Sequence, residues 1–227
     1  MAGWEKSRIS IQVSLSGYSF TVEDGGRSYA SGWLGAERIF TTPDLQRRYD
    51  RVEISLLTPK CALIPESFYS EENKREALAE VVRLRDTDPV HAVKLPEFAA
   101  VLLYSNAIDE SLSRVISQSV LTTDGEQAPV LPELYYLLTD MPWCKEYNKI
   151  LASWRDGYLY LVIAQGKSLL LANVFPAVDF TTAEYFIFLS LKRLQLNPEI
   201  STISWRTPIT AEEEMSLYRY FKAVEQL

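Results

Sequence analysis

The sequence predicts an α/β protein with mixed sheets, built from two similar units in tandem. The stretches SLSGY (14–18) and SWRDGY (153–158) each lie between two alternating apolar runs, as the turn of a β-hairpin does. After each hairpin come a third extended run, a helical pattern and a further strand. The same order of elements therefore occurs twice, and 227 residues suffice for two units of about a hundred residues each.

We expect the first unit, with an insertion, at residues 1–143. Alternating apolar residues predict the hairpin strands, and a near-continuous apolar run predicts a buried strand late in the unit. The predicted strands are 8–14, 18–24, 37–42, 51–57 and 98–104, with a loop at 24–33 and an extended piece at 62–68. Proline after Thr42 begins a short helix, longer helices are predicted at 70–84 and 109–120, and a second short helix is predicted at 131–141.

The second unit is expected at residues 144–227. Its predicted strands are 148–154, 158–164, 169–175 and 199–205. Helix 183–196 is apolar on nearly all sides, which predicts burial on every side, with Phe186, Leu189 and Leu194 inaccessible. The pairs Thr181 with Glu184 and Thr210 with Glu213 have the spacing of capping boxes, and the second pair begins a last helix at 211–227.

This order of elements has a known topology. Three consecutive strands form an antiparallel meander, and a fourth strand reached through a helix returns parallel by a right-handed crossover. That is the ribonuclease-H-like layout. Two such units in tandem give the arrangement of actin, Hsp70 and sugar kinases, so we predict tandem ribonuclease-H-like units in an actin-like ATPase arrangement.

In the actin-like class the first hairpin turn of each unit binds phosphates, with an Asp that orders Mg²⁺ and glycines that expose backbone N–H groups. The usual patterns are D-x-G-x-T and D-x-G-x-G-T. Here the leading Asp is Ser in both turns and most glycines are replaced, so we predict degenerate nucleotide loops. The adenosine-binding glycines also lack a counterpart in SWRTPIT (204–210). The remaining candidates for cofactor binding are Ser14, Ser16, Gly17, Arg155, Asp156 and Gly157.

Other catalytic and metal-binding signatures are weak. GKS at 166–168 resembles the end of a phosphate-binding loop, but Leu161 stands where the first glycine is required and the context is a hairpin. Two cysteines, Cys61 and Cys144, and a single histidine, His91, are too few for a structural zinc site. We expect two reduced thiols, a surface or edge histidine, no metal and no catalytic residue.

Composition restricts the partners. The formal net charge of −7 lacks the basic field that nucleic-acid binding requires, because the basic segment at 46–51 is diluted by Asp50. The sequence has no apolar run long enough to span a membrane and begins without a signal-peptide pattern. We therefore expect a cytoplasmic protein that binds neither nucleic acid nor membrane.

Two stretches resemble a known bacterial family, the domain-of-unknown-function family 3822. They are ALIPESFYSEENKREAL (62–78), with Leu63-Ile64-Pro65 before a helix, and residues 169–199, with Asn173-Val174-Phe175 before the aromatic pair Tyr185-Phe186. The resemblance covers most of the chain and implies an actin-like ATPase fold without an assigned activity or catalytic residue. Trp205-Arg206-Thr207 stands where the family often has a glycine. We expect Phe175 to pack under the aromatic helix and Asn173 to bond turn backbone near Pro176.

Two functional hypotheses from different classes follow. The first is a non-enzymatic adaptor or regulatory binding module whose partner is another protein and which uses no cofactor. The alternative is an atypical nucleotide-binding protein or weak ATPase that uses Ser14, Ser16, Arg155 and Asp156 across the cleft between the units. A sugar-kinase-like enzyme would need a catalytic Asp base in that cleft, which the sequence does not identify. The sequence thus favours a pseudo-ATPase without excluding activity.

Overall fold

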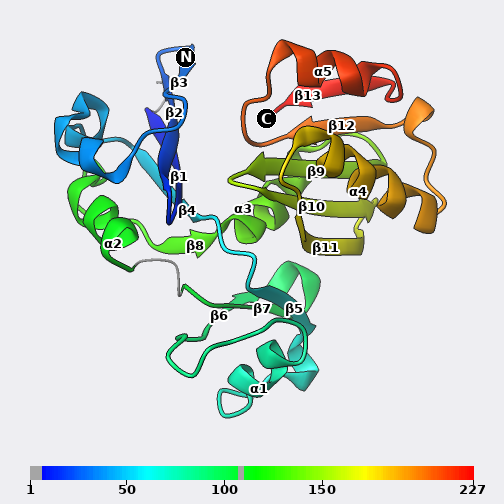
Figure 1. Ribbon diagram of the computed structural model, residues 1–227, viewed down its shortest axis with the longest axis horizontal. Coiled ribbons are helices and arrows are strands. Elements are labelled where there is room, and N and C mark those ends of the chain that lie inside the picture. Colours follow the sequence, from blue (N-terminus) through cyan, green and yellow to red (C-terminus); the bar gives the residue numbers. More distant parts are fainter. Residues whose placement is uncertain (1–6, 107–109) are drawn as a thin grey trace, which may run out of the picture. The chain divides into compact units, whose positions relative to one another are not determined.

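The computed structural model describes residues 7–106 and 110–227 (Figure 1). The chain divides into two compact units. Unit 1 comprises Met1–Thr58, Thr87–Pro89 and Asn106–Pro132, and unit 2 comprises Pro59–Asp86, Val90–Ser105 and Glu133–Leu227. The expected boundary between residues 143 and 144 stays a prediction. Within the described ranges, none of the helices combines the length and apolar character needed to cross a membrane.

Unit 1 contains a five-stranded mixed sheet in the order β3-β2-β1-β4-β8. The first three strands form an antiparallel meander, β4 returns parallel to β1, and β8 pairs parallel with β4. The short 3-10 helices η1 and η2 and the helix α2 contribute Ile39, Leu45 and Ile116 to the core on this sheet. The bounds are β1 Arg8–Ser14, β2 Gly17–Asp24, β3 Arg27–Ala30, η1 Ala36–Thr41, η2 Pro43–Gln46, β4 Arg51–Leu56, α2 Glu110–Ser119 and β8 Val130–Pro132.

The main sheet of unit 2 has the corresponding order, β11-β10-β9-β12-β13. Its core on one face combines Ile150 and Leu161 of the strands with Ile187 of α4 and Leu217 of α5. Helix α3 contacts β9, β10 and β11 but contributes nothing to that core, so it covers the other face. The bounds are α3 Glu133–Asp140, η5 Met141–Trp143, β9 Asn148–Arg155, β10 Tyr158–Gln165, β11 Ser168–Pro176, α4 Phe180–Arg193, η6 Pro198–Ile200, β12 Thr202–Trp205, α5 Ala211–Tyr218 and β13 Ala223–Gln226.

The insertion forms a small antiparallel sheet in the order β5-β7-β6. Leu78 of α1 packs on Val101 and Leu103 of the central strand, which explains the continuous apolar run of β7. His91 lies exposed on the edge strand β6, as expected. The bounds are β5 Cys61–Pro65, η3 Glu66–Phe68, α1 Lys74–Ala79, β6 His91–Leu95, η4 Pro96–Phe98 and β7 Ala100–Tyr104.

The repeated strand order confirms the predicted fold class, but the third strand of unit 1 is not where the sequence analysis placed it. Residues 37–42 lie in η1 and its C-cap, and the third strand is β3, within the expected loop. Gly25 and Gly26, with φ of +56° and +77°, form a two-residue hairpin turn between Asp24 and Arg27. The overlooked signal is therefore the Asp-Gly-Gly turn, which reverses the chain without steric cost.

Helix α4 also differs from its prediction. It begins at Phe180, and its N-cap is Asp179, whose carboxylate accepts a 2.7 Å hydrogen bond from the Thr182 N–H. Ile187 and Leu191 are buried, whereas the three residues expected to be inaccessible, Phe186, Leu189 and Leu194, are only half-buried. The prediction was wrong because α4 covers one face of a sheet and keeps an apolar outer side.

Two other helices are shorter than predicted. Only Lys74–Ala79 of the expected 70–84 helix forms α1. The capping box of Thr210 and Glu213 is confirmed, but α5 ends at Tyr218 and the chain returns as β13, parallel to β12. Strand β13 forms because Phe221 and Val224 belong to the apolar core of the sheet, which a continuing helix would leave.

Candidate functional site

The first hairpin turn, in unit 1, joins β1 to β2 through Leu15 and Ser16. The Ser14 side chain is buried, and its Oγ lies 3.1 Å from the Oγ of Ser16 and accepts a hydrogen bond from the Ser16 N–H. Gly17 has φ of +148°, and a Cβ there would lie 2.1 Å from the carbonyl oxygen of Leu34. The glycine therefore allows the backbone at Leu34 to approach closely. The N–H and C=O groups of Leu34 both form hydrogen bonds with the backbone of Tyr18.

The second hairpin turn, in unit 2, joins β9 to β10 through Asp156 and Gly157. Both residues have positive φ, of 50° and 77°, as a tight two-residue hairpin turn requires. Asp156 is thus at the tip of the turn. Since the six candidate residues are divided between unit 1 and unit 2, the predicted site across both turns stays a prediction.

Arg155 is held by the fold of unit 2. Its Nη2 donates a 2.7 Å hydrogen bond to the Pro208 carbonyl, and its Nη1 donates to the Trp154 carbonyl at 3.4 Å. Burial lowers the pKa of the Arg155 guanidinium, an effect that the nearby carboxylates of Glu213 and Glu133 oppose. The same acidic side chains would repel a phosphate, so the surroundings of this arginine do not favour an anionic ligand.

The loop after β12 is bonded to the end of β9. The Arg206 N–H donates to the Ala152 carbonyl at 2.9 Å, and the Trp154 N–H donates to Thr207 Oγ1 at 3.3 Å. Ser153 Oγ also donates to Thr207 Oγ1, at 3.3 Å. Residues 204–210 lack the adenosine-binding glycines of the actin-like class. Within them, Arg206 and Thr207 instead bond the end of β12 to the end of β9.

A buried charged cluster near this loop was not predicted. The Arg206 guanidinium donates to Glu133 at 2.8 Å through Nη1 and to Asp140 at 3.0 Å through Nε, and it lies 4.6 Å from the ring centroid of Tyr136. All four residues are buried. The sequence signal for this cluster is a charged residue directly after a buried strand, Trp205-Arg206.

The other residues considered in the sequence lie in a hairpin turn or in the protein interior. Gly166 and Lys167 form the turn between β10 and β11, which confirms that GKS is part of a hairpin. Cys61 and Cys144 are buried cysteines outside any disulfide, and burial raises the pKa of each thiol. Among the described residues, no group of three His, Cys, Asp or Glu side chains is placed to hold a metal ion.

Phe175 and Asn173, from the motif in the second unit, make contacts within that unit. The rings of Phe175 and Phe186 stack with centroids 4.8 Å apart, which confirms the expected packing of Phe175 under the aromatic helix. Asn173 Oδ1 accepts a 2.9 Å hydrogen bond from the Val174 N–H, so this side chain bonds its own strand and not the turn near Pro176.

Comparison with known proteins places the chain in a family. The family described as "Protein of unknown function (DUF3822)" matches residues 35–224, which is most of the chain. The chain belongs to this family. No curated protein sequence matches this DUF3822 chain.

Solved structures support the fold of this DUF3822 chain. A Bacteroides thetaiotaomicron protein with an actin-like ATPase fold and unknown function is 17% identical, with a TM-score of 0.66, and the match covers 100% of this chain and 94% of that one. A PilM–PilN type IV pilus biogenesis complex has a TM-score of 0.46 at 12% identity, covering 97% and 88% of the two chains. The apo ParM protein of pSK41 has a TM-score of 0.39 at 8% identity, covering 97% and 92%. The first match confirms the predicted actin-like ATPase fold.

Proposed function

We propose that this DUF3822 chain is a non-enzymatic binding module for another protein, which keeps an actin-like ATPase fold as its scaffold. The observation that carries the proposal is an apolar surface of unit 2 where α4 lies beside the edge strand β11. We call it the α4–β11 face, formed by Leu171, Phe175, Tyr185, Phe186 and Leu189. The structural bonding of Ser14 and Arg155 described above supports the non-enzymatic part of the proposal.

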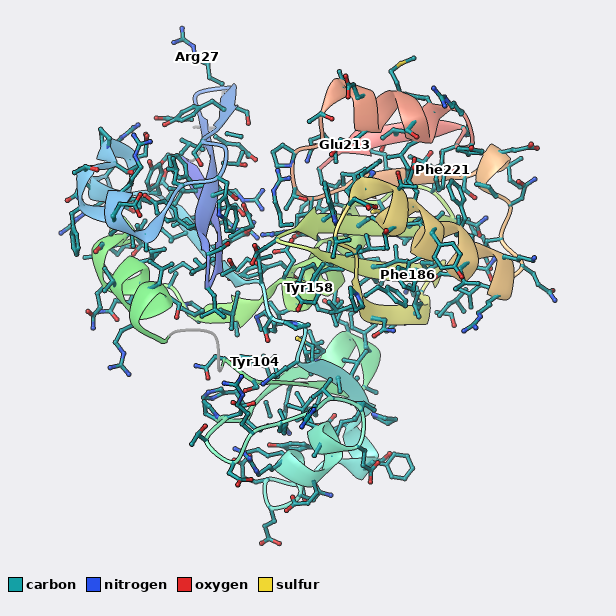
Figure 2. All side chains as sticks on the ribbon, in the orientation of Figure 1. Arg27, Tyr104, Tyr158, Phe186, Glu213 and Phe221 are labelled. Carbon is teal, nitrogen blue, oxygen red and sulfur yellow. The ribbon has the colours of Figure 1, made fainter. Side chains whose placement is uncertain are left out.

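The α4–β11 face is aromatic and accessible. Phe186 stacks on Phe175 and meets the ring of Tyr185 edge-on, with centroids 5.3 Å apart. In Figure 2, Phe186 lies between α4 and β11. Tyr185 is 59% exposed, and the other four residues are half-buried. Exposed aromatic groups on a rigid scaffold are characteristic anchors of protein interfaces.

Strand β11 contributes an unusual edge to this face. Its nine residues, SLLLANVFP, contain no charged side chain. It is hydrogen-bonded to β10 and also contacts β5 of the same unit. Edge strands are normally short or charged, because an apolar edge attracts other chains. The described edge strands β3, β5, β6, β8 and β13 are all shorter. Part of this uncharged strand lies near β5, and its remaining length is consistent with an interacting edge.

The charge pattern of α4 indicates the chemistry of the partner. Tyr185, Leu189 and Arg193 follow each other at intervals of four residues, which aligns them along one side of the helix. Arg193 is exposed at the basic end of this stripe, in a chain whose net charge is −7. We assign the occupant as a protein segment with aromatic or aliphatic anchors and an adjacent carboxylate, which Arg193 would pair.

The test begins with a photo-crosslinking amino acid at position 185 in the full chain, expressed in its native cell. The captured protein is then purified and titrated against wild type, Tyr185→Glu, Arg193→Glu and the control Phe68→Glu. Phe68 is 73% exposed and lies outside the α4–β11 face. We expect Tyr185→Glu and Arg193→Glu to weaken binding by about tenfold or more and Phe68→Glu to have little effect.

Equal affinity of the wild type and Tyr185→Glu for the purified partner would contradict the proposal. Crosslinking of position 185 only to a second copy of this chain would also overturn it, in favour of self-association. Sedimentation of the wild type across a concentration series separates this second outcome from binding of a different protein.

A further inference from the structure

Unit 2 contains a cavity to which neither of the two candidate nucleotide turns, 14–18 and 153–158, contributes. Its volume is about 400 Å³, within the range of about 300–1,000 Å³ that is typical of small-molecule sites. Three parts of unit 2 line it: η4, the segment from η5 into β9, and the turn between β10 and β11. The lining residues are Glu97, Phe98, Met141, Pro142, Lys149, Gly166 and Lys167.

Lys149 supplies a fixed positive charge in this cavity. Its Nζ donates hydrogen bonds to the carbonyl oxygens of Cys144 at 2.6 Å and Met141 at 3.3 Å, and the side chain is half-buried. A lysine ammonium has three N–H donors, so these two carbonyls leave one donor available. The carbonyl dipoles orient the ammonium but do not neutralise it.

Lys149 has no ion-pair partner within the described part of the chain. Neither Lys149 nor Lys167 forms an ion pair with the residues that the structure describes. Glu97, also at the cavity, pairs with neither lysine. A half-buried cation without a counter-charge is costly unless a ligand supplies one, so the cavity favours an anion.

The rest of the lining is apolar. Phe98 is half-buried and Met141 is almost fully buried, and with Pro142 they supply the apolar part of the lining. Such a lining suits a hydrocarbon or aromatic body. Glu97 would repel a second negative charge, so a monoanionic carboxylate fits better than a dianionic phosphate.

We propose that this cavity binds a small organic monocarboxylate, with the carboxylate at Lys149 and the apolar body on Phe98 and Met141. Lys167, which is exposed, adds a second cation to the lining. The site is separate from the α4–β11 face and does not depend on the protein-binding proposal.

The probes are octanoate, the uncharged analogue octanol and the phosphate analogue octyl phosphate, titrated calorimetrically into the full chain. We expect octanoate to bind more tightly than either analogue. Lys149→Met should weaken octanoate binding by about tenfold or more, because it removes a hydrogen bond to a charged group. Lys192→Met, an exposed lysine outside the cavity, should leave the affinity unchanged.

A second measurement uses the wild type, so it remains decisive if Lys149→Met does not fold. Acetic anhydride labels lysines, and mass spectrometry gives the labelling rate of each. Octanoate should slow the labelling of Lys149 and Lys167 several-fold and leave Lys192 unaffected. Equal protection by octanol, tighter binding of octyl phosphate, or no protection of Lys149 at saturating octanoate would overturn the proposal.

Discussion

The guanidinium of Arg206 donates a 2.8 Å hydrogen bond to the carboxylate of Glu133, with side chains only 4% and 0% exposed. Asp140 and the ring of Tyr136 complete the surroundings of the guanidinium. Arg206 follows β12, whereas the other three residues belong to α3. The cluster therefore fixes α3 to the loop after β12 within unit 2.

Removal of Arg206 should strongly destabilise the protein. Arg206→Met leaves two buried carboxylates without their cation, which typically costs about 3–5 kcal/mol. Arg206→Lys keeps the charge but loses the forked geometry, so we expect an intermediate loss. Urea unfolding gives both values, with exposed Lys192→Met as the control. A midpoint for Arg206→Met equal to that of the wild type would show that the cluster is not a stabilising element.

The two candidate glycines should respond very differently to alanine. A Cβ at Gly17 would lie 2.1 Å from the Leu34 carbonyl oxygen, whereas a Cβ at Gly157 would meet nothing within 4 Å. Gly157→Ala should therefore cost only about 1–2 kcal/mol for its left-handed conformation. Gly17→Ala should lower the free energy of unfolding further, because the backbone at Leu34 must also move. Equal losses in denaturant unfolding would contradict the described packing of Gly17.

Truncations in α4 test its one-sided burial. Ile187 is fully buried, so Ile187→Ala should cost about 2–5 kcal/mol. Phe186 is half-buried, so Phe186→Ala should cost less than the roughly 3–5 kcal/mol expected for a fully buried phenylalanine. Chemical unfolding of both variants gives the ranking, and a larger loss for Phe186→Ala would instead support the fully buried helix that the sequence predicted.

The sequence predicts strands and hairpins of this fold well. Ile9, Ile11 and Val13 alternate with polar residues, and their strand is found at Arg8–Ser14 as expected. The turn SWRDGY has two residues of positive φ, which Asp-Gly supplies locally. Local patterns succeed here because alternation and turn geometry are properties of neighbouring residues.

Tertiary partners explain most of the failures. Phe186 belongs to a helix that is apolar all round, and only the position of α4 on one face of the sheet determines which side is covered. The burial of Glu133 requires Arg206, which lies 73 residues away. The cavity around Lys149 joins η4 to residues 141–149 and 166–167, which lie far along the chain. Pairings over such distances leave no periodic signal in the sequence.

The cap of α4 should make stability depend on pH. A hydrogen bond from Thr182 lowers the pKa of the Asp179 carboxyl in the folded protein. Its stabilisation is therefore complete above the unfolded pKa of about 3.9 and is lost as the pH falls through the lower folded value. Asp179→Ala should lower the melting temperature near neutral pH, and this difference should shrink under acid conditions.

Two controls distinguish this cap from the one that the sequence suggested. Asp179→Asn, a good N-cap without charge, should melt close to the wild type near neutral pH. Thr181→Ala should have little effect, because Thr181 lies inside the first turn of α4 and is exposed. A larger loss for Thr181→Ala than for Asp179→Ala would restore the capping box of Thr181 and Glu184.

We expect the full chain to bind Mg-ATP no more tightly than the millimolar range. A triphosphate needs compensation for about four negative charges from metal ions, cations and backbone N–H groups. Ser14 is buried and bonded to Ser16, and Arg155 is bonded to the Pro208 carbonyl beside acidic side chains.

Calorimetry and thermal melting with Mg-ATP measure this affinity directly. A ligand at ten times its dissociation constant stabilises the folded state by about 1.4 kcal/mol, so a micromolar site would raise the melting temperature clearly at millimolar nucleotide. Micromolar binding that Ser14→Ala or Arg155→Ala abolishes would support the nucleotide-binding alternative. Arg219→Ala is the matched control, because this cation caps the end of α5 and belongs to neither turn. We expect the wild type and all three variants to show the same weak response, because neither Ser14 nor Arg155 would contribute to a triphosphate site.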